Sequence, residues 1–172
     1  MSPSIVNGLP AHVLFVHIVV VLVPLSALAL VVCAIWPHLA RRLGVLPPVL
    51  ALVALVSVPL TTQAGEWLEK HVDSSSLVER HAQLGDGLLP WVLGLFVLSS
   101  ALWWAARRTA PGEGDTQGPA IRLTSAPIRT AAVVLSLVVA TGSVVDVYRI
   151  GDSGAKAAWH DAYSKTTRSQ GN

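Results

Sequence analysis

Histidines and carboxylates are the residues of this sequence whose types could support chemistry. Most of them occur near the ends of apolar segments, and one arginine follows the last apolar segment. The set comprises His12, His17, Glu66, His71, His81, Asp86, Asp146 and Arg149. Imidazole and carboxylate groups bind haem iron or divalent metals and exchange protons near neutral pH. If the fold gathers these residues, they could form a metal, haem or proton-handling site.

Two of the histidines define the sharpest interpretation, a haem b held between His17 and His81. His17 lies inside an apolar segment, where a polar group normally faces a partner within a bundle, and helical bundles hold haem through histidines on facing helices. Depth argues against this pair, because His17 should lie about 6 Å below the outer membrane boundary and His81 about 10 Å above it, at about 1.5 Å per residue. A divalent metal bound by His81, Glu66 and His71, or by His12 in place of His71, suits the depths better. No tight ligand spacing supports that alternative.

A charged pair near the end of the last apolar segment has a structural interpretation. Asp146 and Arg149 are three residues apart, and Arg149 could pair with Asp86 or Glu66 across the bundle. We expect such a salt bridge to tie helix ends together as part of a polar cap. The sequence has no glycine-rich phosphate loop, no GxSxG and no HExxH, which argues against a hydrolase or a nucleotide-binding enzyme.

Four apolar runs must position these residues. They are Val13–Trp36, Pro47–Leu60, Leu88–Ala106 and Ile128–Val147. Hydrocarbon about 30 Å thick is crossed by roughly 20 helical residues. With 52% hydrophobic and 13% charged residues, a soluble chain of 172 residues would expose large apolar patches. The sequence therefore predicts an all-α, integral membrane four-helix bundle of one domain, with spans at about 12–36, 46–63, 84–106 and 128–148.

The segments next to the spans predict additional short helices. In Gly65–Val72 the apolar residues fall at helical spacing, which predicts a short interfacial helix between spans two and three. Gly151 and Gly154 are expected to end the last span, with a separate surface helix at Ala155–Tyr163. Aromatic residues near the span ends predict an interfacial belt formed by Trp36, Trp91, Trp103, Trp104 and Tyr148.

Proline inside the first span predicts a kink. Pro24 removes one backbone hydrogen bond, and Ser26 or Ser57 is expected to bond the carbonyl that is left without its donor.

Charges in the connections predict the orientation. The first and third connections carry Arg41, Arg42, Arg107, Arg108, Arg122 and Arg129, whereas the second is acidic, with Glu66, Glu69, Asp73, Glu79 and Asp86 against Lys70 and Arg80. By the positive-inside rule the arginine-rich connections are cytoplasmic and both termini are extracytoplasmic. The net charge of +2 is spread over loops rather than gathered in one patch, so the partner we expect is the lipid bilayer and not nucleic acid.

Several short motifs resemble the prokaryotic membrane family known as domain of unknown function 2231. They are Gly8–His12 with His17, Thr61–Leu68 (TTQAGEWL), Val78–Gly85 (VERHAQLG) and Tyr148–Ala155 (YRIGDSGA). The resemblance covers most of the chain and implies a four-helix protein of the bacterial plasma membrane. Members are frequent in actinobacteria, and some are joined to Rieske-type iron-sulfur domains. It marks as positions to test His17, Glu66, His81, Gly85, Arg149 and Gly151. The chain reads Ala11-His12 where many members read His-Pro.

Two classes of function follow. The first is a non-enzymatic membrane component that assembles with a membrane-protein partner or with copies of itself, its outer polar residues holding helices together. The second is a redox module with haem b or a divalent metal on the extracytoplasmic side. A transporter is the weaker alternative, because the four spans contain no paired intramembrane carboxylates.

Overall fold

The computed structural model describes residues 5–6, 9–69, 76–108 and 126–169 of the chain. A two-stranded antiparallel ribbon comes first, with β1 (Ile5–Val6) pairing with β2 (Leu9–Pro10). The helices that follow are α1 (Ala11–Ile35), α2 (Pro37–Leu43), α3 (Leu46–Glu69), α4 (Ser76–Arg108) and α5 (Ala126–Ser169).

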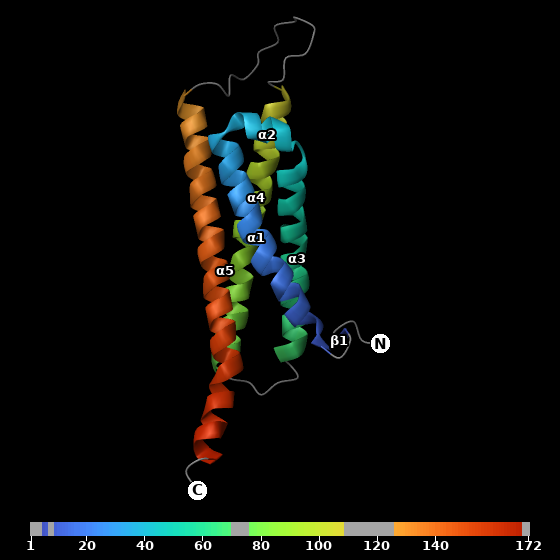
Figure 1. Cartoon of the computed structure of the whole chain (residues 1–172), viewed down its shortest axis with the longest axis vertical. Helices are drawn as coiled ribbons and strands as arrows, with labels where there is room; N and C mark the ends of the chain where they lie inside the picture. Colours follow the sequence, from blue (N-terminus) through green and yellow to red (C-terminus); the bar gives the residue numbers. More distant parts are fainter. Residues whose placement is uncertain (1–4, 7–8, 70–75, 109–125, 170–172) are drawn as a thin grey trace, which may run out of the picture.

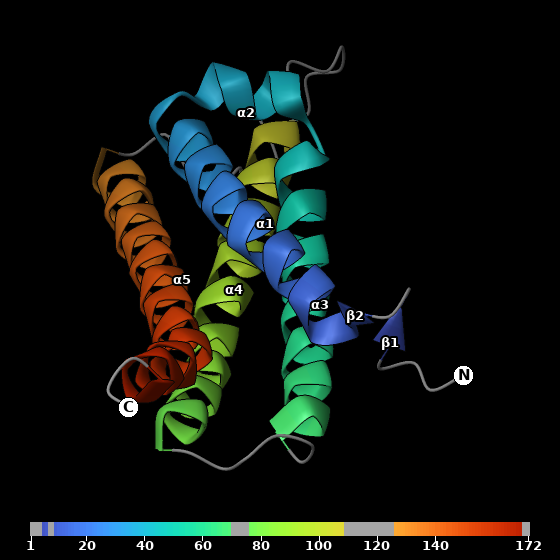
Figure 2. The same ribbon diagram turned by 60° about the horizontal axis from the view of Figure 1, so that its bottom comes forward.

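The four long helices run up and down, and the short α2 lies across one end of them (Figures 1 and 2). α1 packs mainly against α3 and α5, and α4 packs against the same two helices. The order around the bundle is therefore α1, α3, α4, α5. This arrangement confirms the predicted all-α four-helix bundle.

Each long helix contains a stretch able to cross a membrane. These stretches are Phe15–Ile35, Leu46–Glu66, Ser76–Arg108 and Ala126–Ala157. Their outward faces are apolar; Val21 and Leu28, for example, are 62% and 61% exposed. Water would oppose such exposure, whereas hydrocarbon accepts it, and helices satisfy their backbone polar groups without water. The fold is that of a multi-pass membrane protein.

The inward faces follow a repeat in which steps of four and three residues alternate. On α4 the repeat comprises His81, Gly85, Leu88, Val92, Leu95 and Ser99, and on α5 it comprises Ser136, Ala140, Ser143, Val147, Ile150 and Gly154. A mean spacing of 3.5 residues keeps one face toward the neighbouring helices, as in left-handed bundles. His81 and Gly154 thus extend the inward stripe of their helices toward the α5 carboxyl end.

Glycines allow α4 and α5 to approach closely. A Cβ added to Gly94 would lie 3.0 Å from Cγ1 of Val139, and the Trp91 ring occupies the space where Gly142 would carry a side chain. Trp91 is therefore a packing residue between helices, and its predicted place in the interfacial belt is wrong. Trp36, Trp104 and Tyr148 are exposed, as an interfacial belt requires.

Two helices continue where the sequence predicted a break. The segment expected to form a separate interfacial helix is, as far as Glu69, the last part of α3, and its residues 70–72 lie outside the described part. Likewise α5 passes through Gly151 and Gly154 and projects beyond the other helices (Figure 1). A glycine costs only about 1 kcal/mol inside a helix, which the surrounding helical residues offset.

The serines near Pro24 do not take the predicted role. Ser57 Oγ donates to the carbonyl of Val53 in its own helix at 2.7 Å. Ser26 is 1% exposed, and its Oγ has no hydrogen-bond partner within the described residues. The prediction is wrong for both serines: Ser57 bonds a carbonyl of the preceding turn of its own helix, as serines in helices commonly do, and Ser26 bonds no described group.

Candidate functional site

His81 is a histidine that the fold places in the contact between two helices. It lies in the second turn of α4 and is half-buried against α5. Leu88 and Val92 continue the same stripe and are 3% and 0% exposed. The side chain therefore belongs to the contact between α4 and α5 rather than to an exposed polar surface.

A directional hydrogen-bond chain holds the His81 ring. Nδ1 lies 3.0 Å from Oγ of Ser153, and that hydroxyl donates to the carbonyl of Ile150 at 2.8 Å. A hydroxyl has one hydrogen to donate, so Ser153 accepts from the Nδ1–H of His81. In the neutral ring this assigns the lone pair to Nε2.

Gly154 provides the surface on which the ring lies. A Cβ at this position would be 2.9 Å from Cε1 and 3.2 Å from Nδ1 of His81. A side chain there would displace the ring from Ser153. Sequence reasoning missed Ser153 and assigned Gly154 to a helix end; the available signal was that Gly154 lies four residues after Ile150 on the inward repeat of α5.

The predicted polar cap is only partly assembled. Asp146 is half-buried, and its Oδ2 lies 3.5 Å from where Gly87 would carry a Cβ. Asp86 and Arg149 are both exposed. Within the described residues Arg149 forms no ion pair with Asp86 or Glu66, so that predicted salt bridge is not formed.

One ion pair joins Lys156 Nζ to Asp152 Oδ2 at 2.6 Å. Both side chains are exposed and lie on successive turns of α5, so the pair contributes little to stability.

The geometry does not fit a haem held by two histidines. His17 is exposed on α1, two residues and so about 200° from the buried Val19, whereas His81 faces α5. No group of three or more His, Cys, Asp or Glu side chains gathers in the described part of the chain. Glu66 is exposed on α3, and His71 and the side chain of His12 lie outside that part. The metal site predicted from Glu66, His71 and His81 stays a prediction.

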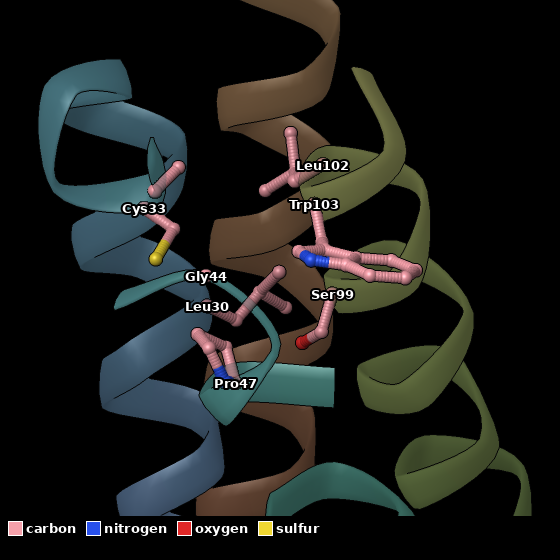
Figure 3. Close-up of a pocket in the computed structure, with 8 residues that line it drawn as sticks. Leu30, Cys33, Gly44, Pro47, Ser99, Leu102 and Trp103 are labelled. Carbon is pink, nitrogen blue, oxygen red and sulfur yellow. The ribbon is translucent and has the colours of Figure 1, made fainter. Parts of the chain in front are cut away.

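A small hollow lies near the opposite end of the bundle (Figure 3). It is lined by Leu30, Cys33, Ala40, Gly44, Pro47, Ser99, Leu102 and Trp103. The space holds about one water, and the Ser99 hydroxyl, in a residue 3% exposed, has no partner within the described residues. With no carboxylate or imidazole in its lining, the hollow offers no acid–base pair for catalysis.

Fold and site together define a four-span helical membrane protein in which a hydrogen bond from His81 to Ser153 joins α4 and α5. A family model described as "Predicted membrane protein (DUF2231)" matches residues 8–167, and the chain belongs to that family. No curated protein and no solved structure matches the sequence.

Proposed function

We propose that the protein is a non-enzymatic component of a bacterial plasma membrane, acting as a subunit or partner in a larger membrane assembly. The hydrogen bond from His81 to Ser153, formed on the flat surface of Gly154, is the observation that carries the proposal. It engages the half-buried imidazole of His81 in helix packing. Asp146 likewise takes part in helix packing, since its carboxylate on α5 lies close to Gly87 on α4.

The orientation we propose places the α2 end in the cytoplasm and both termini outside. Arginines at the α2 end support it, because the connections richest in arginine stay on the cytoplasmic side. The His81 end, with the acidic residues Glu66, Glu79 and Asp86, then faces the extracytoplasmic side.

A redox module is the second candidate, favoured by one feature. Metal-binding histidines usually donate one ring N–H to a protein acceptor, which directs the other nitrogen to the metal. In His81 the bond from Nδ1 to Ser153 is such a bond, and it leaves Nε2 as the nitrogen that could bind a metal. Because the described residues contain no group of three or more His, Cys, Asp or Glu side chains, a haem or metal at His81 would need ligands from elsewhere in the chain or from a partner.

One experiment separates the candidates. The protein is purified in mild detergent from cells grown with added iron and haem precursor, and its absorption spectrum and metal content are compared with those of His81→Ala and His17→Ala. We expect a colourless protein with substoichiometric metal in all three. A Soret band or one metal per chain, lost on substitution of His81, would contradict the proposal and establish the redox module.

A further inference from the structure

Among the residues that the structure describes, the end of the bundle at α2 carries arginines and no acidic side chain. Its described charged residues are Arg41, Arg42, Arg107, Arg108 and Arg129. The acidic residues in the described part lie toward the other end, namely Glu66, Glu69, Glu79, Asp86, Asp146, Asp152 and Asp161. We call the five arginines the arginine end. Its positive charge is not neutralised by any described carboxylate.

Tryptophans fix the position of two of its guanidinium groups. Arg107 Cζ lies 5.0 Å from the Trp103 ring centre, and Arg108 Cζ lies 3.5 Å from that of Trp104. Stacking on an indole orders the guanidinium plane without using its N–H groups as donors. Trp104 is 53% exposed, as expected of a residue at the membrane interface. Both arginines end the stretch of α4 able to cross a membrane, Ser76–Arg108, so a bilayer around that stretch would place them at the level of the lipid headgroups.

The remaining arginines lie at the same end on other helices. Arg41 and Arg42 are exposed in the last turn of α2, which lies across the end of the bundle (Figure 2). Arg129, at the start of α5, donates from Nη2 to the carbonyl of Ile35 at 3.2 Å, at the carboxyl end of α1. Cations from three helices thus meet at one membrane surface.

We propose that the arginine end binds the headgroups of anionic phospholipids, with Arg107 and Arg108 donating to the phosphodiester and α2 adding positive charge. A guanidinium presents parallel N–H donors that match two phosphate oxygens, which favours phosphate over other interfacial groups. Lipid is the source of the phosphate because the stacked arginines lie at headgroup depth. This binding is independent of whether the protein serves an assembly or a redox role.

The test uses the whole protein in detergent with phosphatidylglycerol as the probe and phosphatidylcholine as the neutral reference, binding being measured by native mass spectrometry. Each arginine near an anionic surface is worth about a fivefold change in binding. We therefore expect Arg107→Gln with Arg108→Gln to weaken phosphatidylglycerol binding about 30-fold. Arg41→Gln with Arg42→Gln, on a different helix, should weaken it in the same direction.

The matched control removes two exposed arginines from the other end, as Arg80→Gln with Arg149→Gln. It changes net charge equally and should leave phosphatidylglycerol binding within about twofold of wild type. Equal binding of the two lipids, equal loss in the control, or full displacement by soluble glycerol phosphate at the lipid's concentration would overturn the proposal. Far-UV circular dichroism of each variant verifies that the helices are intact.

Discussion

Replacing Gly142 by alanine should destabilise the bundle by overfilling the contact between α4 and α5. Three atoms of the Trp91 six-membered ring lie where the new Cβ would be placed. They belong to one rigid ring, so the whole indole must move. Overpacking of this kind costs about 1–3 kcal/mol. Alanine regains up to about 1 kcal/mol through its higher helix propensity, which leaves a net loss of about 1–2 kcal/mol.

Gly151→Ala in the same helix is the matched control. A Cβ at Gly151 meets no heavy atom within 4 Å. This variant should be neutral or up to about 1 kcal/mol more stable, because only the propensity gain applies. The difference between the two variants isolates the overpacking cost.

Reversible unfolding by SDS in mixed micelles, followed by circular dichroism, measures both free energies. Trp91→Phe should make Gly142→Ala less costly, since the smaller ring leaves part of the space free. The loss of stability in the double variant should then be smaller than the sum of the two single losses. If Gly142→Ala is as stable as Gly151→Ala, Trp91 does not pack over Gly142 and the contact between α4 and α5 is wrong.

Other substitutions test separate parts of the structure. A double-mutant cycle of His81→Ala and Ser153→Ala should show a coupling of about 0.6–1.5 kcal/mol in the same unfolding assay, and additive losses would refute the hydrogen bond. Ser99→Ala should be neutral or up to about 1 kcal/mol more stable, because it removes a buried hydroxyl without a described partner; a loss above about 1 kcal/mol would show that the hydroxyl is satisfied. Terminal reporter fusions should show mixed orientation after neutralising Arg41, Arg42, Arg107 and Arg108, and an unchanged topology would contradict the proposed orientation.

The membrane-spanning architecture was predictable because its cause is simple. Runs of apolar residues long enough to cross hydrocarbon form helices, because a helix satisfies every backbone hydrogen-bonding group within the run. The helix boundaries were harder. Gly151 and Gly154 were expected to end the last helix, yet α5 continues through both, because a glycine ends a helix only when its backbone adopts another conformation. In the described chain this happens at Gly44, which has a φ of 58° and ends α2.

The site was harder to predict because it depends on pairings between distant segments. His81 was singled out from its type and from the apolar run after it, but its partner Ser153 is 72 residues away. Nothing in a single sequence specifies the rotation of α5 relative to α4. Without that rotation the contact of Trp91 could not be predicted either: its ring was expected at the lipid interface and instead covers Gly142. A heptad count from Leu88 would have placed His81 on the inward face.

The roles of His81, Ser153 and Gly154 all depend on the packing of α4 on α5, and a disulfide tests that packing directly. A Cβ on Gly94 would lie 3.9 Å from Cβ of Val139, within the 3.5–4.5 Å that a disulfide spans. With Cys33→Ser as background, mild oxidation of Gly94→Cys with Val139→Cys in native membranes should form an intramolecular disulfide. Leu93→Cys with Val139→Cys, one position around the helix on an exposed face, should not. Failure of the first pair to cross-link, or preferential cross-linking of the second, would contradict this packing.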